Sequence, residues 1–177
     1  MKSRYILGLW IVMSSLAVHA QNDYTTYQVA FRKGGVMTIS EDLTEVTVTP
    51  TSFTGRGEVR QQWMIKRMGG GKLLIASPAA PGLFLKRNGS AVTMQPYDAD
   101  EHEEYLWVVS GTVSHSHTVG DTPDGPKLLA LLADPSDRQQ VLTSRANGLL
   151  QVATVRYDLA DDPYRIYMVK VTSPGSF

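Results

Sequence analysis

The sequence predicts an all-β protein with an internal threefold repeat. Three observations indicate this fold class: apolar and polar residues alternate in short runs, Gly and Pro recur at short intervals, and three segments of similar pattern follow one another. Alternation with a period of two places successive side chains on opposite faces of a strand. Many short strands separated by turn residues favour a barrel or a sandwich.

The alternating runs are the predicted strands, and turn residues separate them. Alternation is clearest in three runs: Val46–Thr49, Ala91–Met94 and Val152–Val155. Asn88-Gly89 and Asn147-Gly148 are dipeptides typical of tight hairpins, and we expect a type I′ turn at the first of them. Only Lys127–Ala133 could form a helix, and the prolines that flank it limit that helix to about two turns.

The repeat consists of a leading strand, two further strands and a closing strand that carries a large aromatic residue. The leading strands are Tyr27–Phe31, Lys72–Ile75 and Lys127–Ala130. The second strands of the units start at Val36, Leu83 and Val141, and the third strands carry Val46, Val92 and Val152. The closing aromatics are Trp63, Trp107 and Tyr167, each followed by apolar residues, and we expect them to be equivalent core residues.

Three units of four strands give twelve strands, which is the plan of a β-trefoil with pseudo-threefold symmetry. In this fold six strands close a barrel and three hairpins cap one end, so that few strand edges stay free. One four-strand unit cannot bury its apolar face alone, whereas three units share a single core. A Greek-key sandwich and a lipocalin-like barrel are the alternatives of similar size.

The N-terminal residues predict where the protein is located, and the overall composition predicts which partners it does not bind. Residues 1–20 have a basic start, an uncharged apolar run and small residues at Val18 and Ala20, which predicts a secretory signal peptide cleaved before Gln21. Residues 21–177 then form one domain, secreted and extracellular. The chain has no cysteine and its 17 basic residues balance 17 acidic ones, so we expect neither disulfides nor binding to nucleic acid or membranes.

Gln61-Gln62-Trp63 resembles the Gln-x-Trp signature of ricin-B-type lectins, which lies on the fourth strand of a trefoil unit. The equivalent residues in the other units, Tyr105-Leu106-Trp107 and Arg165-Ile166-Tyr167, lack the glutamine. The resemblance implies carbohydrate binding, with Gln61 as the candidate binding residue.

The chain also resembles small cysteine-poor trefoils that inhibit proteases, of the fungal mycocypin and serine-protease-inhibitor type. Their aromatic-ended strands are similar to Trp107-Val108-Val109 and Tyr164-Arg165-Ile166. This resemblance implies a rigid barrel that presents loops to a protease cleft. The candidate contact residues are basic residues in turns and the asparagine beside them: Arg56, Lys86, Arg87, Asn88 and Arg145.

Asn88-Gly89-Ser90 is in addition a glycosylation sequon. A glycan on Asn88 would hinder insertion of this turn into a cleft, so the inhibitory and the glycosylated interpretations compete.

Two polar segments carry residue types that can ligate metals. The acidic run Asp98–Glu104 offers carboxylates for calcium but lacks the spacing of an EF-hand. His115 and His117, with Asp121 nearby, could ligate zinc or copper. Ordinary polar loops are the favoured interpretation of both, and we expect no metal and no cofactor.

The sequence contains none of the common catalytic motifs, such as Gly-x-Ser-x-Gly, His-Glu-x-x-His or a phosphate-binding loop. We therefore expect a secreted, monomeric, non-catalytic binding protein. The first hypothesis is a protease inhibitor. The alternatives are a carbohydrate-binding lectin and an extracellular matrix or structural protein.

Overall fold

The structure is a computed structural model, and it describes residues 24–51, 55–111, 128–133, 140–154 and 166–171. The predicted signal peptide and the histidine pair His115 and His117, with Asp121, lie outside the described residues. In the described part of the chain, no helix has the length and apolar character needed to cross a membrane.

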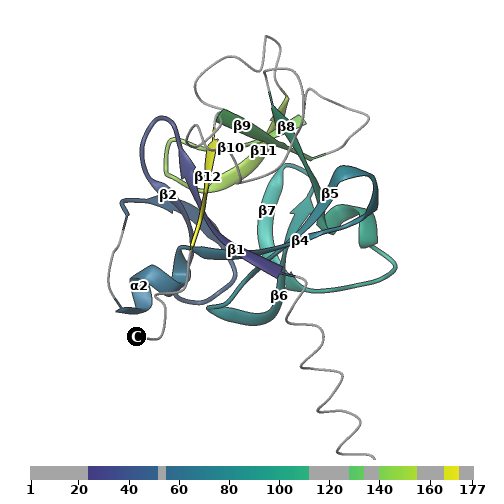
Figure 1. Cartoon of the computed structure of the whole chain (residues 1–177), viewed down its shortest axis with the longest axis horizontal. Helices are drawn as coiled ribbons and strands as arrows, with labels where there is room; N and C mark the ends of the chain where they lie inside the picture. The colour runs from purple at the N-terminus through teal and green to yellow at the C-terminus, as the bar shows by residue number, and fades with distance from the viewer. Residues whose placement is uncertain (1–23, 52–54, 112–127, 134–139, 155–165, 172–177) are drawn as a thin grey trace, which may run out of the picture.

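The described strands fall into three units of four in chain order, and Figure 1 shows how most of them are arranged in space. The first unit contains β1 (Tyr24–Phe31), β2 (Val36–Ile39), β3 (Val46–Thr49) and β4 (Gln62–Arg67). The second contains β5 (Lys72–Ser77), β6 (Ala80–Asn88), β7 (Ala91–Pro96) and β8 (Leu106–Gly111). The third contains β9 (Leu128–Leu132), β10 (Gln140–Ser144), β11 (Leu150–Thr154) and β12 (Ile166–Lys170). Among the described residues, three short helices join strands: α2 (Gly55–Arg60), η2 (Gly69–Gly71) and η3 (His102–Tyr105).

Six strands close a barrel, because the first and last strands of each unit pair with each other and with the neighbouring unit. Around the ring, β1 pairs with β4, β4 with β5, β5 with β8, β8 with β9, β9 with β12, and β12 with β1, all antiparallel. The closed ring leaves no free edge in the barrel itself.

The middle strands of each unit form the hairpins β2–β3, β6–β7 and β10–β11. One β-bridge links each pair of hairpins. The bridges pair Glu45 with Thr93, Thr47 with Leu149, and Ala91 with Gln151. This arrangement of barrel and hairpin triplet is a β-trefoil, so the predicted fold is confirmed. Residues 128–132 form strand β9, as expected for the leading strand of the third unit, and not the short helix that this segment could also have formed.

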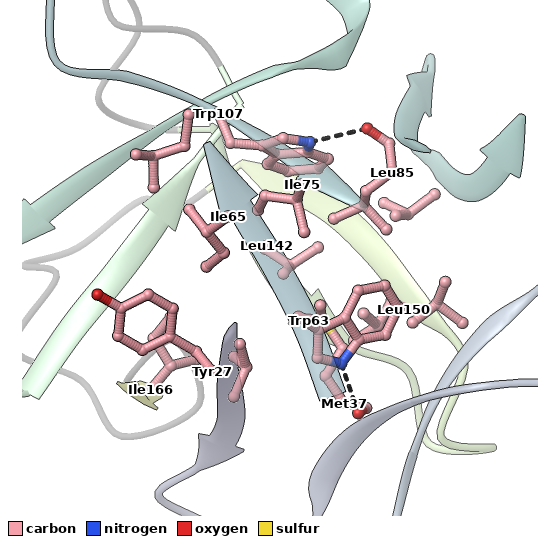
Figure 2. Close-up of a cluster of buried hydrophobic side chains, with 14 of the residues drawn as sticks. Tyr27, Met37, Trp63, Ile65, Ile75, Leu85, Trp107, Leu142, Leu150 and Ile166 are labelled. Carbon is pink, nitrogen blue, oxygen red and sulfur yellow. Dashed lines mark hydrogen bonds between the residues drawn. The ribbon is translucent and has the colours of Figure 1, made fainter. Parts of the chain in front are cut away.

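The core is built from equivalent residues of the three units (Figure 2). The hairpins contribute Met37, Leu85 and Leu142, all fully buried. Trp63 and Trp107 are also fully buried. The indole Nε1 of Trp63 donates to the Met37 carbonyl at 2.8 Å, and that of Trp107 donates to the Leu85 carbonyl at 3.1 Å. The two hydrogen bonds are therefore equivalent under the pseudo-threefold symmetry.

The third unit departs from the expected aromatic, because Ile166 occupies the position equivalent to the two tryptophans. Ile166 pairs with Leu129 of β9 as Trp107 pairs with Leu73 of β5. Ile166 is fully buried, whereas Tyr167 is half-buried and lies outside the core cluster. The prediction for Tyr167 was wrong by one residue, and in a strand such a shift moves the side chain to the opposite face.

The hairpin registers also correct the residue predicted to be equivalent to Val46 and Val92 in the third unit, which was Val152. Val46 pairs with Ile39, Val92 with Arg87, and Leu150 with Ser144. The equivalent of Val46 and Val92 is therefore Leu150, two residues before Val152. Since the shift is even, Leu150 and Val152 face the same side and both are buried.

Candidate functional site

A group of aromatic and acidic side chains gathers on the surface of the second unit. We call it the aromatic–acidic patch and define it as Phe84, Tyr97, Glu101 and His102. Tyr97 follows the last residue of β7 and is 42% exposed, which is unusual for a large apolar side chain among the described residues. Its ring is the centre of the patch.

Three neighbouring rings hold Tyr97 in place. The ring centroids of Phe84 and His102 each lie 5.8 Å from that of Tyr97, with interplanar angles of 69° and 78°. Tyr105 lies 5.2 Å away in a tilted arrangement and is buried. The Tyr97 hydroxyl and His102 Nδ1 also form a hydrogen bond. Edge-to-face contacts of this kind stabilise aromatic pairs and leave the outer ring as a fixed apolar surface.

The segment between β7 and β8, residues 97–105, is ordered by its own hydrogen bonds. The Asp98 carboxylate accepts from the Asp100 backbone amide at 2.9 Å, and the Glu104 amide donates to the Glu101 carbonyl at 2.9 Å. The Tyr105 hydroxyl donates to the Pro96 carbonyl at 2.6 Å and so ties the two ends of the segment together. The patch therefore stands on a defined support.

A buried lysine lies under this segment. Lys86 has only 7% of its side chain exposed, forms an ion pair with Glu101, and lies 3.5 Å from a Glu104 oxygen. Its ammonium also sits 5.5 Å from the centroid of the Tyr105 ring, within cation–π range. The hydrogen bond to Glu101 raises the pKa of Lys86 above its ordinary value, although burial opposes that shift. The acidic side chains therefore compensate a charge that could not otherwise be buried.

Two more cations anchor the segment. Lys72 of β5 lies 2.8 Å from a Glu103 carboxylate oxygen, and Arg87 of β6 donates to the Glu103 carbonyl. The hydrogen bond from Lys72 lowers the pKa of Glu103 below its ordinary value. The carboxylates of the acidic run thus serve as partners of protein cations. No group of three or more potential metal ligands occurs within the described residues.

These contacts correct the expected protease-contact turn. Lys86 was predicted to project from a hairpin, but it is buried and paired, and Arg87 is held against Glu103. Asn88 pairs with Ala91, so the two-residue loop is Gly89 and Ser90. Only Gly89 has a positive φ, of 59°, and this follows the pattern of a type II′ turn, not the expected type I′.

Gln61, the candidate carbohydrate-binding residue, is a structural residue. It is 2% exposed, and its side-chain amide donates to the Pro50 carbonyl at 2.8 Å and to the Thr49 hydroxyl at 3.2 Å. The glutamine therefore fastens the end of β3 beside the start of β4 and offers no surface to a sugar.

The remaining candidates lie apart from the patch in the chain. Arg56 falls within helix α2, not within the expected turn. Arg145 is exposed in the β10–β11 turn, where its Nε donates to the Gln151 side-chain oxygen at 2.9 Å. Asn88 is exposed at the end of β6.

Sequence reasoning missed Phe84, Tyr97 and His102. A signal was present, since Tyr97, His102 and Tyr105 are the aromatic rings of an otherwise acidic segment. Phe84 contacts this segment because β6 pairs with β7. No local sequence pattern specifies the register of that pairing.

Fold and site together define a β-trefoil with an ordered aromatic surface on its second unit. Among solved structures, the chain is similar to an endo-β-galactosidase from Clostridium perfringens that releases GlcNAcα1-4Gal, with a TM-score of 0.62 and 14% identity over 84% of this chain and 33% of that one. It is similar to a mosquitocidal holotoxin with a TM-score of 0.61 and 16% identity, over 84% of this chain and 17% of that one. It is also similar to the designed threefold-symmetric protein ThreeFoil, with a TM-score of 0.55 and 16% identity, over 82% of this chain and 99% of that one.

These similarities show the fold. The chain corresponds to a third or less of the length of the galactosidase and holotoxin chains, and to nearly all of ThreeFoil. No family model matches the sequence, and the comparison with curated proteins finds no match.

Proposed function

We propose that this protein is a non-catalytic binding protein that recognises neutral oligosaccharides through the aromatic–acidic patch. The observation that carries the proposal is the exposed Tyr97 ring, fixed by Phe84 and His102 beside carboxylates that face solvent. An aromatic face stacks on the apolar C–H face of a sugar ring, and a fixed ring loses little entropy when it does so.

The carboxylates supply the polar half of the recognition. The side chains of Glu101 and Glu104 are 46% and 47% exposed, although both approach Lys86. An ionised carboxylate has several acceptor sites, so one contact to Lys86 leaves others for sugar hydroxyls. The acidic surroundings would repel an anionic sugar, and for this reason we assign neutral oligosaccharides to this site.

The fold comparison gives further support. One similar structure is the endo-β-galactosidase that releases GlcNAcα1-4Gal, and the similar region makes up 33% of its chain. A separate β-trefoil part of such a chain is consistent with a binding role for this fold.

The protease-inhibitor hypothesis has less support. Its central residue, Lys86, is buried in an ion pair, and Arg87 contacts Glu103. Arg145 is still an exposed basic residue in a hairpin turn. Stoichiometric inhibition in a panel of serine and cysteine proteases, lost in Arg145→Ala, would favour this second candidate over glycan binding.

We also propose that residues 1–20 direct secretion and that the mature domain is a monomer. Asn88 and Ser90 of the sequon are both exposed, which supports attachment of a glycan at Asn88 in a host that glycosylates.

The test is a glycan array followed by calorimetry on the strongest neutral ligand. Tyr97→Ala should weaken binding by about tenfold or more, because a stacked aromatic face contributes on the order of 1.5 kcal/mol or more. Tyr97→Phe keeps the ring and should bind within about threefold of the wild type. Val169→Ala removes another exposed apolar side chain and is the matched control.

The proposal is overturned if no neutral glycan binds. It is equally overturned if a glycan binds and Tyr97→Ala binds it as well as the wild type does.

A further inference from the structure

A pocket of about 250 Å³ lies where the β1–β2 turn of the first unit meets the end of β10 and the turn that follows it in the third unit. Its lining includes Phe31, Lys33, Gly34, Thr143, Ser144 and Arg145, and we call it the basic pocket. We propose that the basic pocket binds the sulfate ester or carboxylate group of an acidic saccharide. This site and its ligand charge differ from those of the proposed function, so the inference goes beyond it.

The first wall of the pocket is a tight turn. The Gly34 amide donates to the Phe31 carbonyl at 2.9 Å, and the Phe31 amide donates to the Gly35 carbonyl at 3.0 Å. Gly34 has φ of 105°, and no atom beyond its two chain neighbours lies within 4 Å of the position where its Cβ would stand. The absence of that side chain leaves open space beside the exposed Lys33.

The second wall holds an arginine that is already oriented. The Arg145 amide donates to the Leu149 carbonyl at 2.8 Å, and the Gly148 amide donates to the Arg145 carbonyl at 2.9 Å, so the turn is closed. The Arg145 side chain donates from Nε to Gln151 at 2.9 Å. A guanidinium has five N–H donors, and this bond leaves those of its two terminal nitrogens for a ligand. Such a fork matches the paired oxygens of a carboxylate or a sulfate.

In the part of the chain that the structure describes, no acidic group compensates the positive charge of the pocket. Among the described residues, Lys33 and Arg145 are the charged residues of its lining, and that described lining contains no carboxylate. Across the described ranges, neither Lys33 nor Arg145 forms an ion pair. Two cations that converge from different units on one hollow therefore favour an anion in it.

The size and lining of the pocket select a small charged group. Its volume is below the range of roughly 300–1,000 Å³ that is usual for drug-sized ligands. The exposed hydroxyl of Ser144 can donate to an anion and accept from a sugar hydroxyl. Phe31 is buried and adds an apolar ring to the lining of the pocket. A charged group carried on a saccharide fits this combination.

The test uses the full mature chain and four probes: inorganic sulfate, a sulfated heparin tetrasaccharide, an oligogalacturonate tetrasaccharide and neutral maltotetraose. We expect one of the two acidic tetrasaccharides to bind and the neutral one not to compete with it. Comparison of the sulfated and carboxylated probes tells which anion is preferred. Raising the salt concentration should weaken binding, because screening acts on exposed charges.

Arg145→Gln and Lys33→Gln should each weaken binding of the acidic tetrasaccharide by about tenfold, the effect of one lost charge-assisted hydrogen bond. Lys170→Gln removes an exposed charge that does not line the pocket and is the matched control. The inference is overturned if neither acidic probe binds, or if Lys170→Gln weakens binding as much as the pocket variants do.

The two sites can fail separately. If neither acidic tetrasaccharide binds but Tyr97→Ala still weakens binding of a neutral glycan, only the basic-pocket inference is overturned. The reverse result removes the neutral-glycan proposal and leaves the basic pocket in place.

Discussion

Two buried tryptophans show how single residues hold the barrel to its hairpin cap. Trp63 and Trp107 stand on the last barrel strand of their units, and each donates to a carbonyl of a hairpin strand. A buried carbonyl that loses its donor keeps its desolvation cost, which makes such bonds more important than their net strength suggests. In the third unit, Ile166 fills the equivalent space without a donor.

Trp63→Phe should therefore lower the free energy of unfolding by about 2–4 kcal/mol, since it adds an unsatisfied Met37 carbonyl to the loss of buried volume. Ile166→Val, at the equivalent position of the third unit, should cost about 1 kcal/mol because only a methylene is removed. Urea unfolding followed by far-ultraviolet circular dichroism measures both. Equal costs for the two variants would contradict the role given to the indole hydrogen bond.

At the scale of the element, the β7–β8 connection turns an acidic run into an ordered support. Lys86 occupies the hairpin position equivalent to Thr38 and Thr143, as the registers of the three hairpins show, and each of these residues is 6% exposed. Thr38 satisfies its hydroxyl locally, with the Val36 carbonyl at 3.0 Å. A buried lysine at this position needs carboxylates to compensate its charge. In the second unit these carboxylates come from residues 97–105.

The ion pair between Lys72 and Glu103 predicts a pH dependence. Because the pKa of Glu103 is lowered in the folded protein, its stabilising effect is complete above the ordinary value of about 4.5 and is lost as the pH falls below it. Glu103→Gln should be slightly less stable than the wild type at pH 7, and the difference should be smaller at pH 3. Urea unfolding at both pH values tests this, and a difference that stays constant would contradict it.

The sequence was sufficient for the repeat and the fold because strand alternation and turn residues are local signals. It was insufficient for the third unit, where Ile166 and Tyr167 are both apolar and adjacent, and only the pairing with β9 and β1 decides which one points inward. It also could not locate the aromatic–acidic patch or the basic pocket. Both depend on contacts between segments that the barrel and hairpins bring together.

For the whole molecule, the threefold plan constrains the interior and leaves the surface free to differ. Several buried positions of the hairpins repeat from unit to unit with similar residues, such as Met37, Leu85 and Leu142. The surface does not repeat: by the hairpin registers, the first-unit position equivalent to Tyr97 is Thr51. One rigid scaffold can therefore carry an acidic aromatic surface on one unit and a basic pocket at another junction.

The most direct test of the central claim is a two-dimensional aromatic NMR titration of the protein with its strongest neutral oligosaccharide. The account predicts that the resonances of Tyr97, Phe84 and His102 shift together and saturate with the calorimetric affinity, while those of the buried Trp63 and Trp107 stay nearly unchanged. Shifts confined to other parts of the protein, with Tyr97 unaffected at saturation, would contradict it.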